Sequence, residues 1–436
     1  MQSPFHATVT STASPALAAS AARPELLPQL STLRSSYAKV RHATECLCEP
    51  LAIEDYVVQS LPDASPVKWH LAHTSLFFEQ FVLEPLLPTY RAFDPDYREL
   101  FGGGPSARAP GRVRTRALSR PTVEQTFAYR SYVDQHMDSL LGSQPESEEL
   151  GRRVTLGLHR EQQHQEMLLL DLKHAFSLNP LTPIYTDYRA DAPAEAPALE
   201  FLDYEASSVE VGHGGRGFSF DNELPRHTVV LPAFRLANRL ITNAEYRGFV
   251  SCGAYTRAEY WLADGWECLQ RQGWERPLYW DAALECEFTL GGVQRIDPHA
   301  PVAHLSFYEA DAFARWVGAR LPTEFEWEAA ARVHPVQGNF LEERNWRPLP
   351  AIRGSEPMQL FGDAWEWTRS AYAPYPRHAV PQGPLAELYG AFPVNRMVLR
   401  GGSCLTPRSH VRPSCRRDLR ADARWQLTGL RLALDD

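Results

Sequence analysis

The chain has 436 residues, a formal net charge of −9, 44% apolar residues and 22% charged residues. This length and composition are typical of a soluble protein with two or three globular domains. The negative charge argues against nucleic acid as a partner, and no apolar run approaches the roughly 20 residues that span a bilayer. The seven cysteines are an odd set without metal-type spacing, and no secretory signal is evident, so we expect a reduced, cytoplasmic protein.

Residues 1–24 are rich in Ala, Ser and Thr, and we expect a disordered tail there. The spacing of apolar residues over 25–185 predicts a four-helix bundle. Two helix starts are marked: Ser65-Pro66 is a cap followed by proline, and Thr122 has Gln125 three residues on, as in a capping box. The predicted helices run from Leu26 to about Cys48, Ser65 to about Leu83, Thr122 to about Leu141, and about Arg152 to Phe176.

Residues 186–200 form a predicted linker that is rich in Ala, Pro and acidic residues. From 201 to 436, Trp, Gly, Pro and short apolar stretches predominate, which predicts short strands and ordered loops. Clear helical patterns are confined there to Asn243–Val250 and Phe307–Val317. The expected fold class is therefore α+β, with a helical domain at 25–185 followed by a strand-rich domain at 201–436.

Four short motifs in the second half carry a first resemblance. They are LPTEFEWEAAAR (321–332), GDAWEWT (362–368), VLRGGSC (398–404) and TGLRLA (428–433). In this order they resemble the formylglycine-generating-enzyme type of domain, which implies a C-type-lectin-like fold. The residue types themselves predict core positions for Trp365 and Trp367, and buried carboxylates paired with backbone or arginine at Glu324, Glu326 and Glu328.

The first half contains WHLAH (69–73) and HREQQHQE (159–166), which resemble the metal-binding bundle of the DinB type. A DinB-like bundle followed by a formylglycine-enzyme-like domain is the arrangement of the ergothioneine-type sulfoxide synthases. ARWQLTGLRLA (423–433) is also similar to that family, and the resemblance covers roughly residues 30–436. It implies an enzyme that uses Fe(II) and O2 to form a carbon–chalcogen bond on the imidazole of hercynine, the trimethylated betaine of histidine.

The histidines of the first half fit this chemistry. Iron that activates O2 needs a few firm protein ligands and open coordination positions, and neutral imidazole suits Fe(II). The family pattern points to His73 and His164 as metal ligands. We expect His70, in the same motif as His73, to pack beside the site or to support a ligand.

The third metal ligand is a departure from the family. The family has two histidines four residues apart, whereas here Arg160 stands four residues before His164 and His159 stands five before it. In a regular helix, five steps turn a side chain about 140° away. Three alternatives are open: a π-bulge places His159 on the metal, the site has two histidines, or the third ligand comes from elsewhere. We expect the bulge. If Arg160 faces the site, it repels a cation or holds an anionic donor.

The link between the second and third helices is another departure. Related sulfoxide synthases carry a tyrosine pair after a Leu-Phe dipeptide, and one tyrosine is thought to supply a proton or an electron. Here Leu100-Phe101 is followed by three glycines and Pro105, without tyrosine. The link also carries four arginines. Either these arginines are exposed to solvent in a loop, or Arg112 and Arg114 bind an anionic or hydroxyl-rich donor.

The last departure lies near the C-terminus. Where the family has an asparagine that helps to hold hercynine and then an aromatic residue, this chain has Arg417 and Asp418. A zwitterionic betaine needs partners for its carboxylate and for its trimethylammonium group, so we expect Arg417 and Asp418 to fill these roles. A surface Arg–Asp pair is the alternative. Gln163 matches a family residue that contacts the imidazole.

A changed site on an intact scaffold predicts a changed co-substrate. We favour a selenoneine-synthase-like enzyme that joins a selenosugar to hercynine, because a selenol is readily oxidised and needs less help than a thiol. The alternatives are an ergothioneine-type sulfoxide synthase that uses cysteine or a cysteine peptide, and a non-catalytic hercynine-binding paralogue. The expected partners are small molecules, and the oligomeric state does not follow from the sequence.

Overall fold

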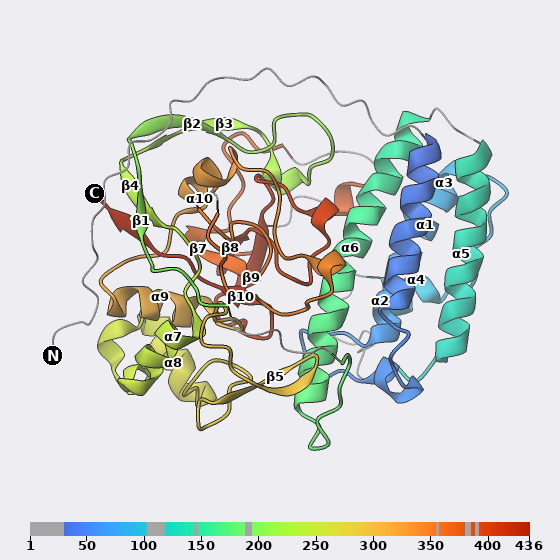
Figure 1. Cartoon of the computed structure of the whole chain (residues 1–436). Coiled ribbons are helices and arrows are strands. Elements are labelled where there is room, and N and C mark those ends of the chain that lie inside the picture. Colours follow the sequence, from blue (N-terminus) through green and yellow to red (C-terminus); the bar gives the residue numbers. More distant parts are fainter. Residues whose placement is uncertain are drawn as a thin grey trace.

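The computed structural model describes residues 30–102, 118–143, 147–187, 194–354, 357–379, 385–388 and 392–436. Figure 1 shows a group of long helices beside a larger part that contains the strands. The predicted α+β class, with a helical N-terminal region before a strand-containing region, is confirmed. The predicted tail at 1–24 lies outside the described residues, as do Arg112 and Arg114.

Four long helices form the N-terminal bundle, as predicted (Figure 1). They are α1 (Leu30–Cys46), α2 (Val67–Phe78), α5 (Val123–Ser143) and α6 (Glu148–Ser177). The capping box at Thr122 is present, because its backbone N–H donates to Oε1 of Gln125 at 2.8 Å and its hydroxyl accepts from the Gln125 backbone at 3.1 Å. At α2 the cap is Pro66 itself, so the helix begins slightly later than predicted.

A buried ionic cluster connects three helices of the bundle. The carboxylate of Glu161 on α6 accepts from Arg41 of α1 at 2.9 Å and from Arg130 of α5 at 2.6 Å. It also accepts from the hydroxyl of Thr44 at 2.7 Å. Glu161 and Arg130 are fully buried. Removing one of them would leave the other as an uncompensated buried charge, which destabilises the fold. The cluster therefore fixes the rotation of α6 relative to α1 and α5.

Short elements follow α2. A π-helical turn, η2 (Glu79–Leu83), extends it into α3 (Glu84–Leu86), and α4 (Tyr97–Phe101) ends just before the undescribed segment 103–117. Glu79 is buried in η2 and accepts hydrogen bonds from the hydroxyls of Tyr90 at 2.5 Å and Tyr129 at 2.8 Å. These bonds tie the connection between α2 and α5 to the bundle.

The second part contains two small sheets and two hairpins. One sheet has the order β1 (Phe201–Tyr204), β4 (Phe234–Ala237), β11 (Ala433–Asp435), and the other has the order β10 (Thr428–Gly429), β7 (Trp365–Ala371), β8 (Arg396–Arg400), β9 (Arg417–Arg420). The hairpins pair β2 (Ser207–Val211) with β3 (His227–Leu231), and β5 (Cys286–Thr289) with β6 (Gly292–Arg295). The helices around them are α7 (Asn243–Ser251), α8 (Ala263–Gln272), α9 (Phe307–Trp316) and α10 (Glu324–Ala331).

The predicted core positions of this part are confirmed. Trp365 and Trp367 are 2% and 0% exposed. Glu324 pairs with Arg416 at 2.7 Å and with Arg400 at 3.1 Å, so it is a buried carboxylate that stabilises the domain. Helices α7 and α9 were expected, whereas α8 and α10 were not, because their short apolar patterns resemble those of the surrounding loops.

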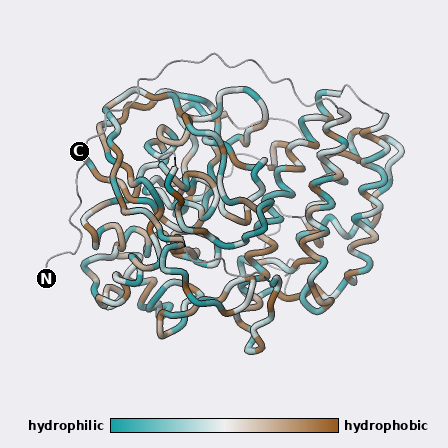
Figure 2. The backbone as a smooth tube through the Cα atoms, viewed as in Figure 1, coloured by the Kyte–Doolittle hydropathy of each residue, from teal (hydrophilic) through white to brown (hydrophobic). Residues whose placement is uncertain are grey.

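Helix α6 runs between the bundle and the strand-containing part (Figure 1). Figure 2 shows apolar and polar stretches alternating along the helices of the bundle. On the side facing the strands, α6 carries Glu166. The Glu166 carboxylate accepts hydrogen bonds from Trp365 at 2.8 Å, Ser403 at 2.6 Å and Arg417 at 2.6 Å. One helix thus contributes to both parts. No helix among the described residues is long and apolar enough to cross a membrane.

The contact between α6 and α2 gives a first prediction. A Cβ at Gly157 would lie 2.6 Å from ring carbons of Phe77 and Phe78. We expect Gly157→Ala to lower the free energy of unfolding by ~1–3 kcal/mol through overpacking. Gly151→Ala in the same helix meets no atom within 4 Å and should raise that free energy by up to ~1 kcal/mol. Urea unfolding measures both, and equal effects would contradict the packing.

Candidate active site

Three imidazoles and one indole gather where α2 faces α6. The ring centroids of His73 and His164 are 4.8 Å apart, and those of His70 and His164 are 5.2 Å apart. The indole of Trp69 stacks on His73, with ring centroids 4.4 Å apart. His70 and His73 point to the same neighbour because residues three apart share a helix face. The structure therefore brings together the two histidines that the family pattern points to.

When His70 is neutral, a hydrogen-bond chain determines which nitrogen of His164 carries the proton. One carboxylate oxygen of Asp171 accepts from the backbone N–H of Ser65 at 2.8 Å and from Nε2 of His70 at 3.2 Å. In a neutral His70 this leaves a lone pair on Nδ1. That atom lies 2.9 Å from Nδ1 of His164, which must then be the N–H donor. The Nε2 atom of His164 is left with its lone pair.

A backbone carbonyl likewise places the proton of His73 on Nδ1. Its Nδ1 atom lies 2.6 Å from the carbonyl oxygen of Phe101, at the end of α4. A carbonyl oxygen only accepts, so Nδ1 carries the proton and Nε2 keeps its lone pair. Phe101 is fully buried, which holds this carbonyl in place. Both His73 and His164 therefore have a lone pair on Nε2.

Both rings are neutral at pH 7. Burial lowers the pKa of His73 to about 4; the hydrogen bond to Phe101 opposes this, and the charge of Arg160 adds to it. Burial also holds the pKa of His164 well below its ordinary value, with further contributions from His73, His70 and Arg160. Neutral imidazole is the form that binds metal ions.

The predicted π-bulge beside His159 is wrong. Helix α6 is regular from Glu148 to Ser177, so the five-residue step turns His159 away from His164. The ring of His159 stacks on Phe218 at 3.9 Å and lies 5.5 Å from the ring of His410, in the strand-containing part. His159 therefore does not join the His73–His164 pair, because nothing shortens the helical step between them.

Arg160 occupies the helical position of the missing imidazole. It stands one turn before His164, and its charge lowers the pKa values of both His73 and His164. Its Nη2 atom donates to the carbonyl oxygen of Leu388 at 3.0 Å, and its guanidinium carbon lies 6.0 Å from the centre of the Phe77 ring. A fixed cation thus stands beside the two neutral imidazoles.

Gln163 and Arg417 approach the same face of α6. Gln163 is three residues before Glu166, so both side chains lie on the face toward the strands. Arg417 donates to Glu166 and, through Nη2, to Gln426 at 2.6 Å. Its guanidinium also lies over the Trp365 ring, 5.4 Å from the centroid. Arg417 is therefore an anchor between α6 and the strand-containing part.

Asp418 does not join this group, and that prediction is wrong. Successive residues of a strand point to opposite faces, and Arg417 and Asp418 are neighbours in β9. Asp418 instead pairs with Arg396 of β8 at 2.7 Å, with both side chains partly exposed. The alternative, a surface pair of Arg417 with Asp418, is not formed either, because Arg417 binds Glu166 and Asp418 binds Arg396.

Among the described residues, the candidate metal donors at this place are the imidazoles of His73 and His164. Within the ranges that the structure describes, no group of three or more His, Cys, Asp or Glu side chains is arranged to hold an ion. Of the three alternatives for the third ligand, the two-histidine site and a ligand from elsewhere remain. Arg112 and Arg114, expected at the donor, lie outside the described residues.

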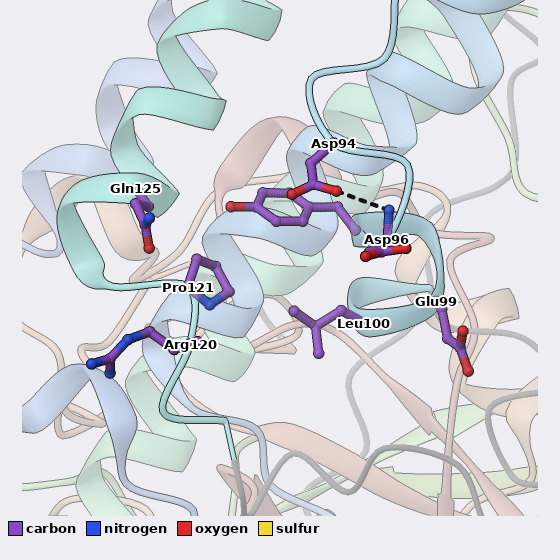
Figure 3. Close-up of a pocket in the computed structure, with 8 residues that line it drawn as sticks. Asp94, Asp96, Glu99, Leu100, Arg120, Pro121 and Gln125 are labelled. Atoms are coloured by element: carbon purple, nitrogen blue, oxygen red, sulfur yellow. Dashed lines mark hydrogen bonds between the residues drawn. The ribbon is translucent and has the colours of Figure 1, made fainter.

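A surface pocket of about 430 Å³ lies between α4 and the start of α5 (Figure 3). Its lining includes the carboxylates of Asp94, Asp96 and Glu99 and the guanidinium of Arg120. Three acidic groups to one basic group do not favour an anionic ligand.

Asp171 and Glu166 are the residues that sequence reasoning missed. Asp171 follows His164 by seven residues, or two helical turns, and therefore lies on the same face of α6. That spacing alone could have predicted a carboxylate on the same helix face as His164. The role of Glu166 had no such signal, because its partners Trp365, Ser403 and Arg417 are some 200 residues or more further along the chain.

Comparisons with known proteins agree with this arrangement. A family profile described as sulfatase-modifying factor enzyme 1-like domain matches residues 197–348 and 356–436. Hercynine oxygenase of Mycolicibacterium smegmatis is 31% identical over 422 residues, which cover 86% of this chain and 92% of the relative. Hercynine oxygenase of Mycobacterium tuberculosis is 36% identical over 243 residues, covering 50% of this chain and 56% of the relative.

Among solved structures, PvdO from Pseudomonas aeruginosa covers 57% of the chain with a TM-score of 0.37 and 16% identity. This likeness is too low to carry an argument about the site.

The hydrogen-bond chain gives a second prediction. In the metal-free protein, ¹⁵N spectra of the histidines should show His164 protonated at Nδ1. His70→Phe removes the acceptor, so the proton should move partly or wholly to Nε2. Asp171→Asn is the matched control: a single oxygen accepts from both Ser65 and His70, so the amide oxygen can keep both bonds. An Nε2–H tautomer of His164 in the unaltered protein would contradict the chain.

Proposed function

Because the chain belongs to the ergothioneine-type sulfoxide synthase family, we propose that it is a nonheme Fe(II), O2-dependent enzyme acting on hercynine. The bond formed joins sulfur or selenium to the imidazole ring, and the donor that we favour is a selenosugar. The supporting observation is the pair of neutral imidazoles on α2 and α6, each with its lone pair on Nε2. The similar proteins of Mycolicibacterium smegmatis and Mycobacterium tuberculosis are hercynine oxygenases, which supports hercynine as the substrate.

His73 and His164 are the residues that would hold the iron. Two neutral imidazoles suit Fe(II) and leave several coordination positions for substrates. Bound Fe(II) would supply the electron-transfer chemistry that activates O2. The chain itself keeps both rings oriented, through Phe101 at His73 and through His70 and Asp171 at His164.

Arg160 favours a negatively charged co-substrate at this centre. A dication beside a fixed guanidinium is destabilised unless an anion lies near both. A selenolate or thiolate donor carries that negative charge. Arg160 therefore takes the family's third-histidine position and, in this proposal, couples metal binding to donor binding.

Hercynine would lie on the strand-facing side of α6. Gln163 contacts the imidazole of the substrate, and Arg417 its carboxylate. Two of the five N–H donors of Arg417 already bind Glu166 and Gln426, so the carboxylate would meet the Nε–H or a remaining Nη–H. With Asp418 facing Arg396, an aromatic face is left as the partner of the trimethylammonium group.

The choice of selenium over sulfur is supported by the rings around the metal pair. In the part of the chain that the structure describes, the aromatic rings that contact His73 and His164 are those of Trp69 and His70, and none is a tyrosine. A selenol is largely ionised at neutral pH and is easily oxidised, so it needs less help from a protein proton or electron donor. The alternatives are C–S bond formation with cysteine or a cysteine peptide, and hercynine binding without turnover.

A third prediction concerns the metal. His73→Ala and His164→Ala should each weaken Fe(II) binding by at least about 100-fold, because even changes to residues that support a ligand cost 10–100-fold. His159→Ala should leave the affinity unchanged, since its ring lies against Phe218 and His410. Anaerobic Fe(II) titration measures all three, with thermal unfolding to check the fold. Full iron affinity in either of the first two variants rules out the assigned site.

The fourth prediction tests the reaction. With saturating hercynine, O2 and reducing conditions, the mass of the product should show selenium transfer from a selenosugar, with poor turnover of cysteine. Equal or better catalytic efficiency with cysteine would assign the protein to the sulfoxide synthases. Hercynine binding without O2 uptake for any donor would favour the non-catalytic alternative.

A further inference from the structure

A chain of aromatic side chains leads away from the histidine pair into the helical bundle. It starts at Phe101, whose carbonyl oxygen accepts a hydrogen bond from His73. The ring centroid of Phe101 lies 5.2 Å from that of Tyr97 in the same helix, α4, and the Tyr97 ring lies 5.0 Å from that of Tyr129 in α5. Rings in contact therefore connect the residue that orients His73 with the interior of the bundle.

The carboxylate of Glu79 is the polar centre of this chain. Its Oε2 atom accepts from the hydroxyl of Tyr129 at 2.8 Å, and its Oε1 atom accepts from the hydroxyl of Tyr90 at 2.5 Å and from the backbone N–H of Phe93 at 3.1 Å. Glu79 is 2% exposed, and none of the described lysines, arginines or histidines forms an ion pair with it. Buried charges are normally paired with an opposite charge, whereas this carboxylate has two phenols as partners.

Tyr90 continues the chain toward the surface. Its ring centroid lies 5.9 Å from that of Tyr132, and the ring of Phe93 lies 5.4 Å from those of both Tyr129 and Tyr132. Tyr132 is half-buried, and its hydroxyl donates to the backbone carbonyl of Arg91 at 2.8 Å. The aromatic contacts thus end at a tyrosine that solvent can reach.

The backbone at Glu79 is irregular. Helix α2 ends at Phe78, and the π-helical turn η2 begins at Glu79. Such turns are rare and frequently lie at functional sites. Burial of a carboxylate without a cation also costs free energy, which the stability of the bundle does not explain. An irregular turn that places such a carboxylate between two phenols indicates a chemical role for this group.

We propose that this chain is a redox relay, which carries an oxidising equivalent from the iron site to the surface of the bundle when no substrate is bound. The residues oxidised in turn are Tyr129, Tyr90 and Tyr132, with the rings of Phe101 and Tyr97 as the link to the iron site. The inference rests on the proposed function, because an Fe(II) site that reacts with O2 is the source of the oxidising equivalent.

The hydrogen bonds to Glu79 balance each step. Burial, with Glu79 adding to it, raises the pKa values of Tyr129 and Tyr90, so both phenols are protonated at pH 7. When Tyr129 gives one electron to the oxidised iron, its proton moves to Oε2 of Glu79, which leaves a neutral tyrosyl radical beside a neutral carboxyl group. Tyr90 then gives an electron to Tyr129 and a proton to Oε1, while the first proton returns from Oε2 to Tyr129.

The last step occurs at the surface. Tyr132 gives an electron to the Tyr90 radical, Tyr90 regains its proton from Glu79, and the proton of Tyr132 goes to water. A thiol in solution then supplies one electron and one proton to Tyr132 and becomes a thiyl radical. The net reaction reduces the iron by one electron, oxidises one thiol and restores Glu79 as a carboxylate, so no side chain is consumed.

Electron paramagnetic resonance of the full-length, Fe(II)-loaded protein tests the relay. The protein is mixed with O2 without hercynine or donor and then frozen. A tyrosyl radical should form, and its signal should narrow when the protein contains deuterated tyrosine. Tyr129→Phe should remove this signal. Glu79→Gln keeps an acceptor oxygen but cannot take the proton, so the radical should form at least about 100-fold more slowly, which is the contribution of a positioned proton acceptor.

Tyr255→Phe is the matched control. The hydroxyl of Tyr255 also donates to a buried carboxylate, that of Glu309, at 2.6 Å, but it lies in the strand-containing part, so this change should leave the radical signal as it is. Tyr132→Phe should let the radical form but slow its decay by added thiol, because the exit at the surface is lost. Thermal unfolding checks each variant, and Tyr132→Phe decides the question if Tyr129→Phe does not fold.

The Fe(II) affinity and the Fe(III) signal are recorded for the same proteins. Oxidation of the iron without a tyrosyl radical, or an unchanged radical in Tyr129→Phe, overturns the relay and leaves the metal site in place. A radical that responds to deuterated tryptophan and disappears in Trp69→Phe also overturns it, because the equivalent then leaves through the indole stacked on His73. A chain that binds no Fe(II) contradicts the proposed function itself, and the relay then has no source.

Discussion

The regular geometry of helix α6 is the constraint on which the rest of the structure depends. A step of 100° per residue sends Glu161 into the ionic cluster of the bundle, His164 toward α2, and Gln163 and Glu166 toward the strands. The ionic cluster with Arg41 and Arg130 fixes the rotation of the helix. A bulge within this segment would turn the side chains that follow it away from their present neighbours, relative to those that precede it.

Neighbouring groups orient the imidazoles of His73 and His164 through hydrogen bonds. A backbone carbonyl fixes the proton of His73, and a histidine supported by a carboxylate fixes the proton of His164. Burial then keeps both rings neutral. A metal ion would therefore meet two lone pairs already directed by hydrogen bonds, beside a cation, Arg160, that favours an anionic co-substrate.

Local patterns in the sequence predicted the parts of the fold that depend on local interactions. The four helices follow from apolar periodicity, and the Thr122–Gln125 capping box formed as expected. The bulge at His159 failed because it was inferred from a family spacing and not from a strained or inserted residue in α6. Asp418 failed because strand β9 was not predicted there, and its alternation separates Asp418 from Arg417. The chain from Asp171 to His164 needs α2 and α6 packed together, which no linear pattern contains.

The number of imidazoles on the iron tests the central claim most directly. X-ray absorption fine structure of the Fe(II)-loaded protein, prepared without O2, counts these ligands in solution. Two imidazoles are expected for the unaltered chain, and a third should be detected in Arg160→His, because this change restores the four-residue step to His164. Three imidazoles in the unaltered protein would contradict the two-histidine site.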